Sequence, residues 1–156
     1  MSGFYGKATV AIVAALMLGG CTTSGVDKTA TTSIAAAPTD ISQADLTAGK
    51  SQFRAANYGL AEKHFRKAVE LRADNSEAWM GLAASYDQLG RFDFADRAYD
   101  QLLKVAGRRP EIVNNMGYSQ LLRGNKKQAR KLLVEARNAM ADPRVVDANL
   151  ALLNRI

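Results

Sequence analysis

Residues 75–110 decide the fold, and they read NSEAWMGLAASYDQLGRFDFADRAYDQLLKVAGRRP. Leu82 and Tyr86 follow Trp79 by three and seven residues, so the three side chains share one face of a helix. Gly90 then interrupts the pattern, as a break between two helices does. The stretch therefore predicts a helix, a tight turn and a second helix.

The pattern recurs along the chain at a spacing of 34 residues. Ala95, on the second helix, has counterparts in Ala61 and Ala129. Further series at this spacing are Phe65, Tyr99 and Leu133; Gly49, Ala83, Gly117 and Ala151; and Gly90 with Gly124. Small residues are expected where two antiparallel helices approach most closely, because a bulky side chain there would force them apart. One such pair cannot bury its apolar face alone, so successive pairs should stack.

These residue types at these offsets resemble the tetratricopeptide repeat, a helix–turn–helix unit of 34 residues. The resemblance implies an all-α fold, a right-handed α-solenoid of three repeats at about 42–75, 76–109 and 110–143 with a C-terminal capping helix at 143–156. We expect helices at about 42–55, 58–72, 76–89, 92–106, 110–123, 126–140 and 143–154. Ser42 is the expected N-cap of the first helix, and Pro110 suits a first helical position.

An apolar segment near the N-terminus has the features of a signal peptide. Residues 8–18 (ATVAIVAALML) follow Lys7 and are fewer than the about 20 that a membrane-spanning helix needs. The next residues, Gly-Gly-Cys ending at Cys21, complete a likeness to the bacterial lipobox. That resemblance implies a lipoprotein signal peptide at 1–20 and covalent lipid on Cys21, the only cysteine. The alternative is an ordinary secretory signal peptide with Cys21 incidental.

Residues 21–41 are expected to be the lipidated cysteine and a flexible tether. The segment is rich in Thr, Ala and Ser and lacks aromatic residues, so it cannot bury enough apolar surface to order itself. Such a tether of about 20 residues reaches about 25 Å on average. Thr22 stands where lipoproteins retained in the inner membrane commonly have Asp, so the resemblance implies the periplasmic face of the outer membrane.

The composition does not point to catalysis. The chain has one Cys and one His, His64, which leaves no set of residues for a multi-cysteine or histidine-based metal site. We expect His64 to be a partly exposed helix residue, and we expect no enzyme activity, metal, cofactor or small-molecule substrate. The net charge of +6 is mild for a nucleic-acid binder, so no nucleic acid is expected as a partner.

A basic cluster opens the sixth expected helix. Its members are Arg123, Lys126, Lys127, Arg130 and Lys131. One interpretation is a solubilising surface, and the other is a contact with lipid headgroups or with an acidic partner.

In the tetratricopeptide family the first helix of each repeat lines the concave face. The positions of this chain that match the concave-face positions of the family form a candidate partner-binding groove. Its members are Leu46, Lys50, Phe53 and Arg54 in the first repeat; Met80, Ala84, Asp87 and Gln88 in the second; and Asn114, Tyr118, Leu121 and Leu122 in the third. The face is mixed, with apolar members at both ends, which suits an amphipathic helix or an extended peptide. Phe53 and Leu121 could instead pack under neighbouring helices.

The combination of lipobox, tether and three repeats is similar to small outer-membrane lipoproteins of secretion and pilus machines, above all those of the Flp/Tad (tight-adherence) pilus. Residues 112–153 carry this likeness: IVNNMGYSQLLRGNKKQARKLLVEARNAMADPRVVDANLALL. It implies a non-enzymatic scaffold that binds protein partners, the outer-membrane secretin or other pilus-assembly components, and helps the secretin localise or assemble. Two interpretations stay open beside it: a pilotin of type IV pili or an outer-membrane protein assembly lipoprotein, and a periplasmic regulator that tethers a cell-wall enzyme.

Overall fold

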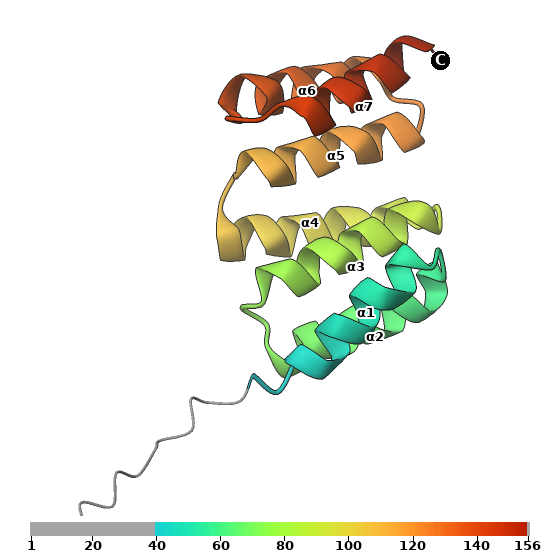
Figure 1. Ribbon diagram of the computed structural model, residues 1–156, viewed down its shortest axis with the longest axis vertical. Coiled ribbons are helices and arrows are strands. Elements are labelled where there is room, and N and C mark those ends of the chain that lie inside the picture. The colour runs from blue at the N-terminus through green and yellow to red at the C-terminus, as the bar shows by residue number, and fades with distance from the viewer. Residues whose placement is uncertain (1–39, 156) are drawn as a thin grey trace, which may run out of the picture. The chain divides into compact units, whose positions relative to one another are not determined.

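The computed structural model describes residues 40–155, which form seven α-helices (Figure 1). They are α1 (Gln43–Arg54), α2 (Tyr58–Leu71), α3 (Ser76–Gln88), α4 (Phe92–Ala106), α5 (Pro110–Leu122), α6 (Lys126–Ala139) and α7 (Arg144–Arg155). Each expected helix is present, with bounds that agree with the sequence prediction to within one residue. The predicted signal peptide, Cys21 and the tether as far as residue 39 lie outside the described residues. Within 40–155, no helix has the length and apolar character needed to cross a bilayer.

The helices pack as three pairs, α1 with α2, α3 with α4 and α5 with α6, and the pairs stack along the chain (Figure 1). Small residues lie where the helices of a pair meet, as predicted. A Cβ atom built on Gly49 would come within 2.8 Å of the Phe65 ring, and one built on Gly117 within 2.8 Å of Leu133. Ala83, at the equivalent position of the second pair, is fully buried. Large side chains of the second helix therefore fill the space that small residues of the first leave open.

The turn inside each repeat needs one residue in the left-handed region. Gly90 has φ +68° and Gly124 has φ +78°, a conformation that glycine adopts without steric strain. In the first repeat Ala56 takes this place with φ 57°. A hydrogen bond from the Asn57 side-chain amide to Gln52 closes the same turn at 2.9 Å.

Buried side chains form two clusters. The first draws on α1 to α4, with Phe65 and Leu102 among its members, and includes Ile112 of α5. The second draws on α5 to α7 and includes Leu133. Met116 packs against both clusters. The core therefore divides at the junction between the second and third repeats.

The last described helix, α7, packs against α6 and α5. Its buried residues are Val146 and Leu153. At the positions equivalent to Val113 and Leu121 of α5, which are buried, α7 carries Asp147 and Arg155, which are exposed. Asp147 accepts a hydrogen bond from Arg137 Nε of α6 at 2.6 Å. At these two positions α7 is thus polar where α5 buries apolar side chains.

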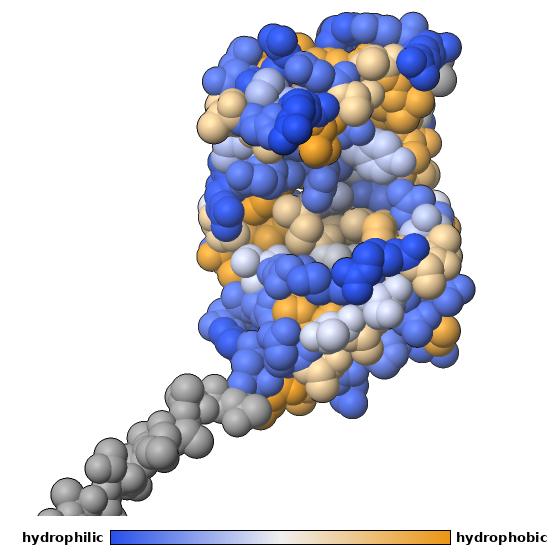
Figure 2. All heavy atoms as spheres, in the orientation of Figure 1, coloured by the Kyte–Doolittle hydropathy of each residue, from blue (hydrophilic) through white to orange (hydrophobic). Residues whose placement is uncertain are grey.

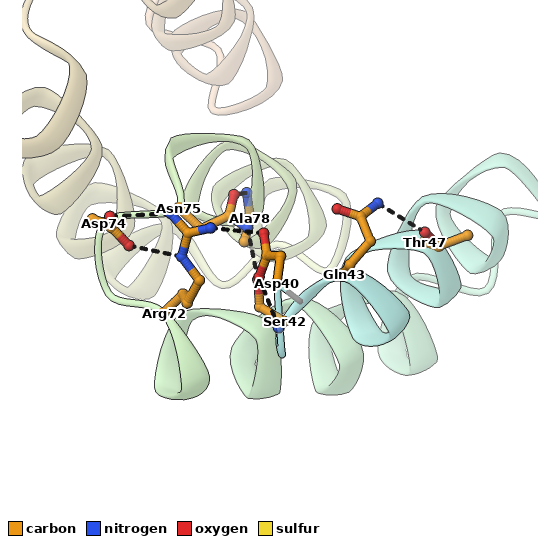
Figure 3. A network of polar contacts seen from close by, with 8 residues as sticks. All are labelled: Asp40, Ser42, Gln43, Thr47, Arg72, Asp74, Asn75 and Ala78. Atoms are coloured by element: carbon orange, nitrogen blue, oxygen red, sulfur yellow. Dashed lines mark hydrogen bonds and ion pairs between the residues drawn. The ribbon is translucent and has the colours of Figure 1, made fainter. Parts of the chain in front are cut away.

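Ser42 stands at the N-cap position of α1, but its side chain makes no capping hydrogen bond. Its backbone N–H and its hydroxyl both donate to Asp40 Oδ1, at 2.9 and 2.7 Å, and the hydroxyl accepts from Asn75 at 3.0 Å (Figure 3). Arg72 Nη1 donates to Asp40 Oδ2 at 2.8 Å. These bonds from Ser42, together with Arg72, hold the pKa of Asp40 below its usual value. The network ties the start of α1 to the connection between α2 and α3.

Candidate partner-binding groove

The odd-numbered helices share one face of the described structure. In Figure 1 α1 lies in front of α2, α3 in front of α4 and α7 in front of α6, and Figure 2 shows the same face with apolar surface exposed between α3 and α5. This face is the one that the sequence assigned to a groove, because each helix contributes residues at equivalent positions of the repeat.

A cavity of about 330 Å³ lies on this face where α1, α3 and α5 meet. Its lining consists of Phe53, Ala84, Asp87, Gln88, Tyr99, Asn115 and Tyr118. All of these except Tyr99 and Asn115 were predicted groove residues. At about 30 Å³ per water molecule, the cavity has room for about ten waters or for a large side chain. Asn115 lies three residues before Tyr118 on the same helical face, so helical spacing alone could have identified it.

Two hydrophobic residues of the predicted groove face the core. Leu46 and Leu121 are 4 % and 6 % exposed and belong to the two apolar clusters. The prediction of Leu46 as a partner-binding residue is therefore corrected, and for Leu121 the structure favours the second interpretation, packing under neighbouring helices. Phe53, for which the sequence left both interpretations open, is half-buried, packs edge-on to the Tyr58 ring at 5.2 Å and also lines the cavity.

Asn114 is also corrected, since it is buried and bonded within the fold. Its Oδ1 accepts from Asn149 Nδ2 of α7 at 2.9 Å, and its own amide donates to Asn115 Oδ1 at 3.3 Å. Asn115 Nδ2 in turn donates to the sulfur of Met80 at 2.8 Å. A chain of side-chain amides thus connects α7, α5 and α3. Met80 is half-buried and lines a second cavity, of about 190 Å³, at the other end of the same junction.

Asp87 is the most constrained member of the cavity wall. It is 4 % exposed, and its two oxygens accept hydrogen bonds from Tyr99 at 2.9 Å and from Ser119 at 2.6 Å. Burial raises the pKa of Asp87, against the effect of these hydrogen bonds and of the Arg123 guanidinium, which lies 3.8 Å away. Burial, together with the charge of Asp87, raises the pKa of Tyr99 well above its usual value. Asp87 therefore joins the second repeat to the third and does not present a carboxylate to a partner.

Arg123 belongs to this junction and not to the basic surface. It forms two hydrogen bonds with Asp96, at 2.8 and 2.7 Å, and its side chain is 14 % exposed. Its guanidinium carbon lies 4.9 Å from the centre of the Phe92 ring. The prediction that Arg123 contributes to an exposed basic cluster is corrected, because Asp96 and the ring enclose its charge. The four remaining members, Lys126, Lys127, Arg130 and Lys131, do line one exposed surface of α6 together with Val134.

His64 is a partly exposed helix residue, as predicted. Its Nδ1 lies 3.0 Å from Asp45 Oδ1, and its side chain is 38 % exposed. The hydrogen bond with His64, and then Lys67, holds the pKa of Asp45 below its usual value. Within residues 40–155, no three of the His, Cys, Asp and Glu side chains come together in a way that could hold a metal ion.

The tetratricopeptide repeat family model matches residues 52–114. Many solved structures are similar to this chain, and three of them are described here. One, described as the functional characterization of Pseudomonas aeruginosa pilF, is 24 % identical with a TM-score of 0.62 over 72 % of this chain and 51 % of its own. The Arabidopsis OM64 TPR domain is 14 % identical with a TM-score of 0.64 over 73 % and 94 % of the two chains. The Yersinia enterocolitica type III secretion chaperone SycD, in complex with a peptide of the translocator YopD, is 19 % identical with a TM-score of 0.60 over 72 % and 91 %.

The chain thus spans about half of the Pseudomonas structure, 51 % of it, and most of the other two. No curated protein sequence matches it. The comparisons confirm the predicted fold, an all-α tetratricopeptide solenoid.

Proposed function

We propose that this tetratricopeptide solenoid is a non-enzymatic scaffold, held at the outer membrane by lipid on Cys21, that assists the assembly of a tight-adherence pilus. In the residues quoted above the chain resembles TadD, the lipoprotein of the Flp/Tad system. In this role the groove holds a segment of the outer-membrane secretin or of another pilus component. The lipid keeps the domain at the membrane where that partner assembles.

The observation that carries the scaffold proposal is the cavity at the centre of the groove. Its wall has two polar groups, the Gln88 amide and the Tyr118 hydroxyl, that make no hydrogen bond within residues 40–155. The ring of Tyr118 and the half-buried Phe53 supply apolar surface beside them. Aromatic rings next to unused hydrogen-bonding groups suit a protein segment, which brings both apolar side chains and backbone amides. The complex of SycD with a YopD peptide supports the proposal, because that chain has the same fold.

The cavity offers no group poised for catalysis. Its one carboxylate, Asp87, is bonded to Tyr99 and Ser119 through both oxygens. Tyr99 donates to that carboxylate, so its hydroxyl is engaged in the fold. These contacts favour binding over chemistry.

The experiment is a pull-down from solubilised outer membranes with the lipidated protein as bait. The double variant Tyr118→Asp/Leu122→Asp places two charges on the groove and should abolish retention of the pilus component while helicity by circular dichroism stays unchanged. The matched control is Leu60→Asp/Val134→Asp, because these residues are 47 % and 42 % exposed on even-numbered helices. Full retention by the groove variant would refute the proposal. Recovery of barrel-assembly components or of a cell-wall enzyme in place of pilus components would favour the other two interpretations.

A further inference from the structure

Two rows of residues at equivalent repeat positions run along the odd-numbered helices, one from all four of them and one from α1, α3 and α5. The first row is Lys50, Ala84, Tyr118 and Leu152, and the second is Arg54, Gln88 and Leu122. Both rows change in the same order. Each begins with a cation on α1, passes a small or neutral residue on α3, and ends with large apolar residues on α5 or α7. The chemistry of the groove is therefore graded along the stack.

The cations at the α1 end are available to a partner. Arg54 is exposed and makes no hydrogen bond or ion pair within residues 40–155. Lys50 contacts Glu77 alone, and the two side chains are 44 % and 58 % exposed. An exposed ion pair of this kind contributes little and is readily exchanged for another partner.

The apolar residues at the other end have no cover. Leu122 is 37 % exposed and Leu152 is 39 % exposed, and Tyr118 lies half-buried in the first row. The sequence predicted apolar groups at both ends of the groove, but Leu46 on α1 is buried, so the exposed apolar surface gathers over α5 and α7. When a partner covers an apolar patch of this kind, the burial of its surface contributes favourably to the free energy of binding.

The cavity lies between the two ends, under Ala84 and Gln88. Its carboxylate is already bonded and lies close to Arg123, so the cavity presents no free charge. A charged side chain placed there would lose its hydration without gaining a partner. The cavity therefore accepts an uncharged side chain.

We infer that the occupant of the groove is a protein segment with acidic residues at one end and apolar residues at the other. The acidic end lies over Lys50 and Arg54, one apolar side chain enters the cavity, and the apolar end covers Leu122 and Leu152. This inference rests on the proposed function of the groove and specifies its partner. Charge complementarity would fix the orientation of the segment, and apolar burial would supply affinity.

Synthetic fluorescein-labelled peptides test the grading. One carries a block of Glu followed by a block of Leu and Phe, and a second carries the same blocks in reverse order, so that both directions of the bound chain are tested. Matched peptides have Lys in place of Glu. Fluorescence anisotropy is measured with the protein purified from membranes in detergent. We expect one of the Glu peptides to bind about tenfold more tightly than its Lys counterpart, a difference that shrinks as salt is added.

Two variants separate the ends of the groove. Lys50→Glu/Arg54→Glu should reverse the preference from the Glu peptide to the Lys peptide, and Lys127→Glu/Lys131→Glu on α6 should leave it unchanged. Leu122→Ser/Leu152→Ser should weaken both peptides about equally. An unchanged preference in Lys50→Glu/Arg54→Glu would overturn the inference. So would failure of the protein to bind any of the peptides while Tyr118→Asp/Leu122→Asp still abolishes partner retention, a result that leaves the proposed function intact.

Discussion

The spacing of α1 and α3 depends on one aromatic ring, and replacing Gly81 by Ala should disturb it. A Cβ atom at Gly81 of α3 would lie 2.4 Å from two ring carbons of Phe65 on α2. Contacts that short do not persist, so either the ring or α3 must move. The ring cannot retreat toward α1, because it already lies where a Cβ at Gly49 would come within 2.8 Å. Phe65 is 2 % exposed, which leaves it no solvent to move into.

Two opposing terms set the size of the effect. Alanine is about 1 kcal/mol more favourable than glycine inside a helix. Overpacking a filled core costs roughly 1–3 kcal/mol. With the ring enclosed by two helices, we expect the upper part of that range, so that Gly81→Ala lowers the free energy of unfolding by about 1–2 kcal/mol. Gly59→Ala is the matched control, because nothing lies within 4 Å of a Cβ at that helical position and only the propensity gain remains.

Urea unfolding followed by circular dichroism measures both variants. Gly59→Ala should raise the midpoint, and Gly81→Ala should lower it. The double variant Gly81→Ala/Phe65→Leu supplies a coupling test, because the smaller side chain makes room for the new methyl group. It should be more stable than the sum of the two single changes predicts. Equal midpoint shifts in Gly59→Ala and Gly81→Ala would refute the reasoning, and so would strict additivity in the double variant.

Other predictions concern the anchor, the turns, the packing and the response to acid. Cys21→Ser should leave unprocessed precursor in the inner membrane, and normal processing with outer-membrane fractionation would contradict the lipid anchor. Ala56→Gly should raise the free energy of unfolding by about 0.5–1 kcal/mol in urea, because φ 57° strains alanine but not glycine. Ala95→Leu should lower the melting temperature through overpacking of about 1–3 kcal/mol, since Ala95 is 0 % exposed. The pKa of Asp45 is held below 3.8, mainly by His64, so its stabilising contribution is present above pH 3.8 and is lost as pH falls through the lower folded-state pKa. In Asp45→Asn, the free energy of unfolding measured in urea should therefore fall less steeply as the pH is lowered through this range.

The fold was predictable from the sequence because its signal is repeated. Ala61, Ala95 and Ala129 each occupy the same position of the repeat and are each fully buried. The same requirement for a small residue thus appears three times, and all three occurrences indicate the same alignment of the repeats. Helix bounds followed from the turns, where Gly90 and Gly124 adopt positive φ. A periodic pattern averages over local exceptions, so that a single residue that departs from it does not displace a predicted helix.

The groove was harder to predict because it depends on the contacts between repeats. From the sequence alone, Asp87 and Arg123 have the pattern of surface charges. The stacking of α5 on α3 brings them to within 3.8 Å, and their side chains are only 2 % and 14 % exposed. Leu121 differs from Leu122 by one helical step, and that step separates a core position from an exposed one. Repeat spacing identifies equivalent positions, but not how far each helix turns its face toward its neighbour.

The divided core has a consequence for how the protein opens locally and for how a bound segment changes that opening. Because the apolar clusters separate at the junction of the second and third repeats, we expect residues 40–155 to contain two cooperative units, of which the C-terminal one opens independently in native-state hydrogen exchange. The groove spans that boundary, with Arg54 on one unit and Leu122 on the other. A bound segment should therefore slow the opening of the C-terminal unit, because it contacts both units. The free energy of binding then includes the coupling between them. Amide protons of α5 and α6 should show this gain in protection before those of α2.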